Sequence, residues 1–135
     1  MSKTLTMLMM DPPYESSNTI TALRIVEAAL RKGNHVNVFA YEGAVSLTFK
    51  EQKKHANAVK GTTLEEEDHP LPKDLVASLV GLAKENNLRL TWTNCGLCVD
   101  ERGVGNWIEG ASRGSPADFI KAVTESDNAL VIATT

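Results

Sequence analysis

Residues 4–41, TLTMLMMDPPYESSNTITALRIVEAALRKGNHVNVFAY, hold the pattern that decides the fold. The apolar run at 4–10 is typical of a strand covered on both faces of a parallel sheet. Residues 19–32 follow with apolar side chains at helical spacing, and Gly33 supplies the stop. The run VNVFAY at 36–41 then predicts a second strand. The stretch therefore predicts a strand–helix–strand unit.

Strands and helices continue to alternate along the rest of the chain. A short helix near 43–50 precedes residues 51–72, where a lysine-rich part gives way to an acidic part, as expected for an exposed charged loop. The remaining predicted elements are a helix at 73–87, a strand at 88–93, a helix at 115–126 and a strand at 129–134. This order predicts one α/β domain over residues 1–135, with three layers and a mainly parallel sheet.

The helix at 115–126 has a clear start signal. Ser115 stands at the cap position, Pro116 at the first helical position, and Asp118 completes a capping-box pattern. These three residues predict where the helix begins.

Length and composition fit an ordinary globular domain. The 135 residues are 42% hydrophobic and 23% charged, with a formal net charge of −3, and such a chain can bury a core. A chain without a basic surplus and with 5% aromatic residues is a poor candidate for nucleic-acid binding. The N-terminal apolar run ends at Asp11, too short for a membrane span, so we expect a cytoplasmic protein with no membrane partner.

Two loops lie where the predicted strands end. DPPYESSN (11–18) follows the first strand, and TNCGLCVDERG (93–103) follows a later one. In parallel α/β sheets, ligands and reactive groups gather beyond the carboxyl ends of the strands. We therefore expect the two loops to be neighbours and to form the functional site.

The second loop holds the chain's two cysteines, Cys95 and Cys98. Cys95 comes just after a strand and just before a helix predicted within 99–110. Free amides and the positive end of a helix dipole stabilise a thiolate at such a position, and placement of this kind lowers a thiol pKa. The alternative is a pair of buried small hydrophobic residues.

Two neighbours bear on the reactivity of Cys95. Gly96 removes a side chain beside the sulfur and lets the backbone approach closely. Arg102 lies seven residues on; its guanidinium would either stabilise the anion or pair with Asp100 or Glu101. The sequence leaves both roles for Arg102 open.

Metal and cofactor chemistry find little support. One C-x-x-C pair lacks the four ligands of a structural zinc site, so no metal is expected. Glycine-rich nucleotide motifs and a serine elbow are also missing, so no cofactor is expected. C-x-x-C is nevertheless a redox spacing, which keeps a dithiol–disulfide oxidoreductase as an alternative.

The first loop offers a second group of candidates. Ser16, Ser17 and Asn18 are most simply a helix cap, although free amides there would also bind a small anion. Asp11 is either a turn residue before two prolines or a charge that faces the cysteine site. Both interpretations of Asp11 remain open.

Most of the chain resembles the DsrE/DsrF-like family, especially its YchN-like branch. The resemblance rests on NCGLCVDERGVGNWIEGASRGSPADFIKAVTESDNALVIAT (94–134), and on DPPY, ALRIVEAAL and KGNHVNVFAYEGAV in the N-terminal half. Residues 51–72 match least. The resemblance implies a flavodoxin-like subunit that assembles into homotrimers or hexamers.

The resemblance also implies a function. Family members with assigned roles carry a persulfide on one cysteine and hand its sulfur to a partner thiol. Their active cysteine stands seven residues before the arginine of an Arg-Gly pair, and the position matching it here is Cys95. Cys98 has no counterpart in those members, and its role stays open.

The expected function is therefore a cytoplasmic sulfur carrier or sulfurtransferase. Its partners would be sulfur-donor and sulfur-acceptor proteins or small sulfane-sulfur compounds. The alternatives are the dithiol oxidoreductase and a non-catalytic assembly or binding subunit with both thiols buried.

Overall fold

Five parallel strands form the centre of the molecule. The computed structural model describes residues 2–134. The strands lie in the order β4-β3-β2-β1-β5, and every neighbouring pair is parallel. Their bounds are β1 Thr4–Met9, β2 His35–Ala40, β3 Leu90–Cys95, β4 Ala111–Gly114 and β5 Asn128–Ile132. The predicted α/β class with a parallel sheet is confirmed.

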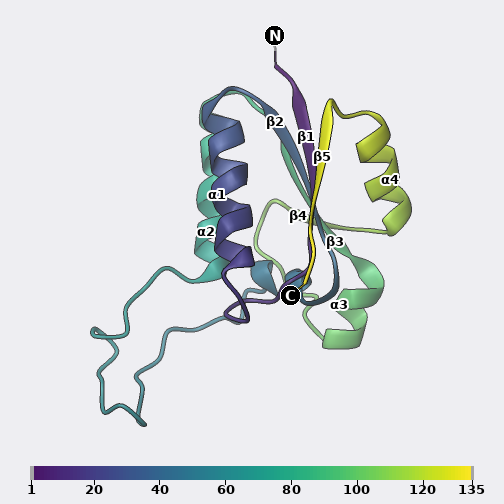
Figure 1. The fold of residues 1–135 in the computed structure, drawn as a ribbon. Helices are drawn as coiled ribbons and strands as arrows, with labels where there is room; N and C mark the ends of the chain where they lie inside the picture. The colour runs from purple at the N-terminus through teal and green to yellow at the C-terminus, as the bar shows by residue number, and fades with distance from the viewer. Residues whose placement is uncertain (1, 135) are drawn as a thin grey trace.

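Helices cover the sheet on both faces, which gives three layers (Figure 1). The two long helices, α1 (Asn18–Arg31) and α2 (Pro72–Glu85), pack side by side on one face. The shorter α3 (Gly96–Arg102) and α4 (Pro116–Thr124) lie on the opposite face. A 3₁₀ helix, η1 (Glu42–Thr48), follows β2. This is the three-layer flavodoxin-like arrangement expected from the sequence.

The core lies mainly between the sheet and the two long helices. Of the four residues at helical spacing on α1, Leu23, Val26 and Leu30 are buried as predicted, whereas Ile20 in the first turn is exposed. The C-terminal stop is also confirmed, because Gly33 adopts a φ of +84°, which glycine reaches without strain. Strand residues such as Met7 fill the sheet side of the same core.

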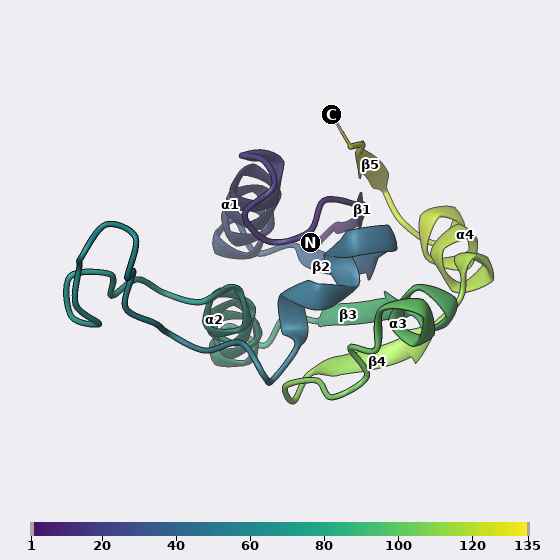
Figure 2. The same cartoon turned by 90° about the horizontal axis from the view of Figure 1, so that it is seen from below.

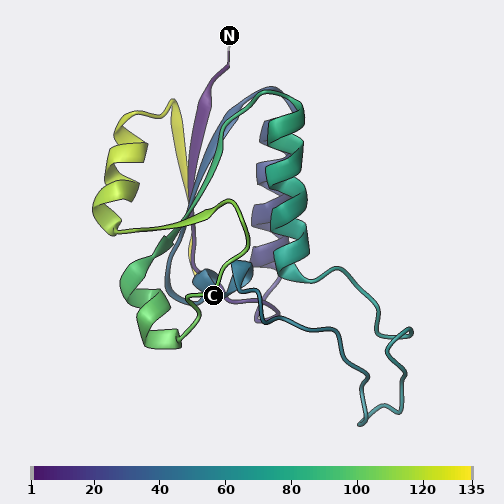
Figure 3. The same cartoon turned by 180° about the vertical axis from the view of Figure 1, so that it is seen from behind.

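Residues 49–71 form a long irregular loop that extends away from the domain beneath α1 and α2 (Figures 1 and 3). The loop carries the charged run of the sequence, and the prediction of an exposed segment is confirmed. Among the described residues, no helix is long and apolar enough to cross a membrane.

Three expectations need correction. The helix predicted within 99–110 is Gly96–Arg102, so it begins directly after Cys95. A fifth strand, β4, occupies Ala111–Gly114, where no strand was predicted; it is short, polar and at the sheet edge. The loops after β1 and β3 are not direct neighbours, because β2 and η1 stand between them.

Candidate functional site

Cys95 sits where β3 passes into α3. It is the last residue of the strand and the cap residue of the helix, with φ −60° and ψ 119°. Strand alternation turns Thr91, Thr93 and Cys95 to one face of the sheet and the buried Trp92 and Asn94 to the other. The predicted position at a strand's carboxyl end is therefore confirmed, and Figure 2 shows α3 and η1 meeting at this end.

Both cysteines are free and buried, with only 3% of Cys95 and 4% of Cys98 exposed. Their surroundings differ. Cys98 lies one turn into α3, and its Sγ accepts a hydrogen bond from the backbone N–H of Glu42 at 3.2 Å. The two sulfurs therefore lie in different environments, one at the start of α3 and the other one turn into it.

The thiol of Cys98 holds its proton tightly. Burial, together with a hydrogen bond to the Cys95 side chain, raises the pKa of Cys98 from 9.0 to about 11, although the Glu42 N–H opposes the rise. At neutral pH, Cys98 is therefore a protonated thiol and a weak nucleophile, since the thiolate is the reactive form.

Gly96 is the contact point for an arginine that the sequence did not single out. A Cβ at Gly96 would meet Nε of Arg113 at 2.5 Å, Cζ at 2.6 Å and Nη2 at 2.7 Å. The sequence predicted a close approach of the backbone at Gly96, but the group that approaches is the side-chain guanidinium of Arg113. The register of β3 and β4, in which Asn94 pairs with Arg113 and Cys95 with Gly114, brings it there.

Arg102 lies at the other end of α3. Its Nη2 donates to Glu42 Oε2 at 3.0 Å, its Nη1 donates to the carbonyl of Cys98 at 3.4 Å, and a longer ion pair of 3.8 Å reaches Glu101. The sequence left open a pairing with Asp100 or Glu101; the structure shows only the longer contact to Glu101, and the main partner is Glu42, which the sequence did not indicate. Arg102 therefore holds Glu42 in place, and the backbone N–H of Glu42 donates to Cys98 Sγ.

Two polar residues fix η1 against β3. Asn94, fully buried and directly before Cys95, donates from Nδ2 to Thr48 Oγ1 at 2.9 Å. This bond anchors the end of the strand on which Cys95 stands. Among the residues described, no group of three or more His, Cys, Asp or Glu side chains is arranged to hold a metal ion.

The residues of the first loop bind one another. Ser16 Oγ donates to the carboxylate of Asp11 and accepts the N–H of Asn18 at 3.1 Å. Ser17 is the N-cap residue of α1, and the Asn18 side chain donates to the carbonyl of Ala133 at 3.2 Å. Asp11 therefore turns toward its own loop, and anion binding by this group stays a prediction.

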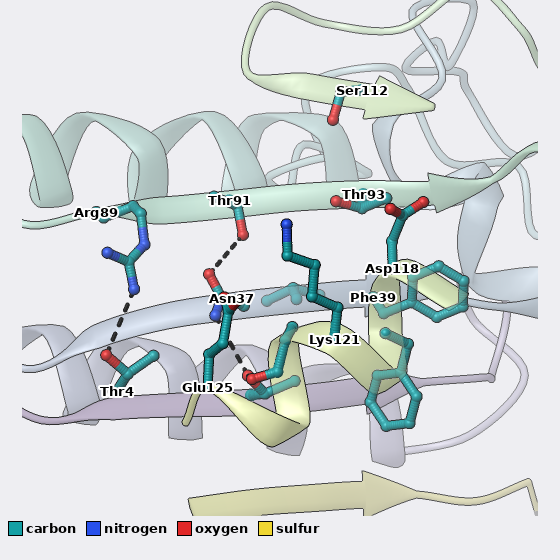
Figure 4. Close-up of a pocket in the computed structure, with 14 residues that line it drawn as sticks. Thr4, Asn37, Phe39, Arg89, Thr91, Thr93, Ser112, Asp118, Lys121 and Glu125 are labelled. Carbon is teal, nitrogen blue, oxygen red and sulfur yellow. Dashed lines mark hydrogen bonds between the residues drawn. The ribbon is translucent and has the colours of Figure 1, made fainter. Parts of the chain in front are cut away.

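A polar cavity of about 640 Å³ lies on the sheet face beside α4 (Figure 4). Thr91 donates to Asn37 at 2.8 Å on its floor, and Lys121 extends over it from α4 (Figure 4). Thr91 and Thr93, which line the cavity, precede Cys95 on the same face of β3. This cavity could not be predicted from the sequence, because it depends on how α4 packs over the sheet.

Comparison with known proteins agrees with this architecture. The family model described as the DsrE/DsrF-like family matches residues 3–132. The chain is 29% identical over 127 residues to the uncharacterized protein MJ0989 of Methanocaldococcus jannaschii, covering 93% of this chain and 96% of that protein. The crystal structure of the ychN protein from E. coli has the same fold, with a TM-score of 0.68, 18% identity, and 97% and 99% of the two chains covered.

Proposed function

The chain belongs to the DsrE/DsrF-like family, and we propose that it is a sulfur carrier or sulfurtransferase that takes up and hands on persulfide sulfur at Cys95. The observation that supports the proposal is the position of Cys95. It is a free cysteine at the junction of β3 and α3, beside a thiol that stays protonated. The family's sulfur-relay roles point to the same residue.

The transfer step needs no cofactor. The Cys95 thiolate attacks the outer sulfur of a donor persulfide, a new S–S bond forms on Cys95, and the donor's S–S bond breaks. The donor leaves as a thiolate while the transferred sulfur stays as the terminal sulfur of a Cys95 persulfide. Delivery to an acceptor thiolate is the same exchange in reverse, so sulfur moves with no net oxidation.

The helix N-terminus at Cys95 suits this chemistry. Free backbone N–H groups at the start of α3 stabilise negative charge on the thiolate and on the persulfide that replaces it. Because Cys95 is buried, transfer also requires a local opening around α3, which is only seven residues long. Short, largely exposed elements open at low free-energy cost.

The donors and acceptors would be proteins with reactive thiols or small sulfane-sulfur compounds, in a reducing, cytoplasmic setting that keeps both cysteines free. We also propose a homo-oligomer, a trimer or hexamer. Leu97 on α3 and Ile120 on α4 support it, since they leave apolar side chains 71% and 61% exposed on one face of the subunit.

Sulfur loading followed by intact-mass measurement tests the function. Incubation with a sulfane-sulfur donor should add the mass of one sulfur atom to the wild-type chain and to Cys98→Ser, and none to Cys95→Ser. A wild-type chain that gains no sulfur, or a Cys95→Ser variant that still loads, would exclude the proposal.

A dithiol–disulfide oxidoreductase is the second candidate, supported by the influence of the Cys95 side chain on the pKa of Cys98. It requires a reversible Cys95–Cys98 disulfide, formed with loss of two electrons and two protons to a disulfide substrate. Activity would then be lost in both single variants. Sulfur transfer that persists in Cys98→Ser favours the carrier over the oxidoreductase.

A non-catalytic assembly or binding subunit is the third candidate, and the burial of both thiols is the feature in its favour. It predicts slow, incomplete alkylation of Cys95 and Cys98 in the native protein. Alkylation of Cys95 that is much faster than that of Cys98 contradicts this candidate.

A further inference from the structure

Arg113 reaches the neighbourhood of Cys95 by the pairing of β3 with β4. The two strands are parallel, with Asn94 opposite Arg113 and Cys95 opposite Gly114. Three guanidinium atoms of Arg113 occupy the space that a side chain at Gly96 would fill. A positive charge therefore lies against the residue that follows the candidate nucleophile, 18 positions away in sequence.

Asp100 holds that guanidinium in a fixed orientation. Nη1 of Arg113 donates to Oδ1 at 3.0 Å and Nη2 donates to Oδ2 at 2.7 Å. Two parallel hydrogen bonds fix the plane of the guanidinium as well as its distance. Asp100 stands four residues after Gly96, so both lie on the same face of α3. The pair bridges α3 and β4 with the cation at the Cys95 end.

The charged and titratable groups around Cys95 come from η1 and the residue before it, from α3, from β4 and from α4. They are Tyr41, Glu42, Cys98, Asp100, Arg113 and Asp118, and Arg113 is the one cation among these six. Arg102 is engaged with Glu42. The backbone of Arg102 lies roughly 10 Å along the helix axis from Cys95, at about 1.5 Å per residue, and its guanidinium reaches back to the carbonyl of Cys98, one turn into α3. Arg113 is thus the cation nearest to the start of α3 in this set.

We propose that Arg113, held by Asp100, is a positioning residue that stabilises the anionic form of Cys95, first as the thiolate and then as the persulfide. The effect is electrostatic, through the space left by Gly96. It agrees with the raised pKa of Arg113, to which Asp100 contributes most and Cys95 contributes as well. The inference rests on the proposed function for its purpose, but the charge on Cys95 is measured without any sulfur transfer.

The test is the pH dependence of Cys95 alkylation by iodoacetamide in the intact protein. Tandem mass spectrometry separates Cys95 from Cys98 in each sample. In Arg113→Gln we expect the midpoint of the rate profile to move to higher pH and the rate at neutral pH to fall about three- to tenfold, since one nearby opposite charge, partly exposed, is lost. The plateau rate at high pH should not change. Arg113→Lys keeps the positive charge but loses the two parallel hydrogen bonds to Asp100. Its midpoint should lie between those of wild type and Arg113→Gln.

Two further variants separate charge from structure. Gly96→Ala keeps the arginine but displaces its guanidinium, and it should shift the midpoint in the same direction. Arg31→Gln removes an exposed arginine of the same kind, paired with Glu27 on α1, and should leave the profile unchanged. Ultraviolet absorbance of the thiolate across the same pH range reports the charge without requiring reagent access.

Several outcomes would overturn the inference. A midpoint in Arg113→Gln equal to that of wild type excludes an electrostatic role. Faster alkylation at every pH, plateau included, shows that the Arg113–Asp100 pair only covers the cysteine. A shift in Arg102→Gln as large as that in Arg113→Gln shows that the charge acts from the other end of α3. The proposed function is tested separately. If sulfur loading fails but Arg113→Gln still shifts the midpoint, the proposed function is wrong and the electrostatic role of Arg113 is supported.

Discussion

The two cysteines of one loop meet different surroundings, although both are buried. Cys98 is enclosed within α3 and receives an N–H from Glu42, whereas Cys95 ends a strand at the N-terminus of that helix. The raised pKa of Cys98 makes it a weak nucleophile at neutral pH, which is consistent with our proposal that Cys95 is the nucleophile.

Cys98 should link stability to alkaline pH. Its pKa is about 11 in the folded chain and ordinarily 9.0, so the folded state keeps a proton that the unfolded state loses first. The stabilisation is therefore fully present below about pH 9 and is lost as pH rises toward 11. It amounts to roughly 2–3 kcal/mol.

Urea unfolding at several pH values checks this prediction. The free energy of unfolding of wild type should fall more steeply between about pH 9 and 11 than that of Cys98→Ala, with the two curves parallel below that range. Curves that stay parallel throughout would show that Cys98 titrates normally in the folded protein.

Sequence reasoning at the residue scale identified Cys95 and Gly96 but missed Arg113. The spacing from Cys95 to Arg102 drew attention along the helix, but the Arg102 guanidinium is engaged with Glu42 and the carbonyl of Cys98. Arg113 becomes a neighbour only through the strand pairing Asn94↔Arg113. The one available signal was the glycine at position 96, because a residue without a side chain leaves room for another group, here the Arg113 guanidinium.

At the scale of elements, local signals fixed where helices begin. The N–H of Ser115 donates to Asp118 Oδ2 at 2.8 Å, and Pro116 occupies the first position of α4, as the sequence pattern predicted. Capping residues act through bonds to their own nearby backbone, so they can be recognised without knowledge of the fold.

Loss of this cap should destabilise the protein measurably. Asp118→Ala removes the acceptor for the Ser115 N–H and should lower the free energy of unfolding by about 1 kcal/mol. Glu109→Ala, at an exposed position outside the helices and strands, serves as the matched control and should change it little. Equal stability of the two variants would mean that the capping box contributes nothing in this protein.

The strand β4 could not be predicted from the sequence. Its four residues, Ala111–Gly114, are polar and partly exposed, so they lack the apolar run or alternation that announces a strand. They are extended because β3 offers a free edge, and Gly114 permits the close approach of Thr93 and Asp118. A partner strand, and not local propensity, creates this element.

At the scale of the whole molecule, the two faces of the sheet are covered unequally. The long helices α1 and α2 bury one face, whereas α4 has no fully buried residue and leaves a polar cavity beside it (Figures 1 and 4). Apolar side chains on α3 and α4 remain exposed on this side. Such a face is suited to contact with a second copy of the chain.

Assembly through this face is testable by solution mass. The wild-type protein should have the mass of a trimer or a hexamer of the 14.6 kDa chain. Ile120→Asp should reduce that mass because it places a charge in the proposed contact. Val59→Asp, at a 98% exposed position in the irregular loop, is the control and should not. A wild-type mass of one chain contradicts the oligomer, and an unchanged Ile120→Asp mass contradicts this face.

The sequence by itself determined the alternation of strands and helices, the parallel sheet, the start of α4 and the position of Cys95 at the end of a strand. All of these depend on short-range pattern and on the few topologies open to repeated strand–helix units. The tertiary structure alone decided which groups surround the sulfur. Strand order placed η1 between the two loops, and strand register brought Arg113 and not Arg102 to Gly96. These contacts join residues distant in the chain, and their positions follow from strand order and register, which local pattern does not specify.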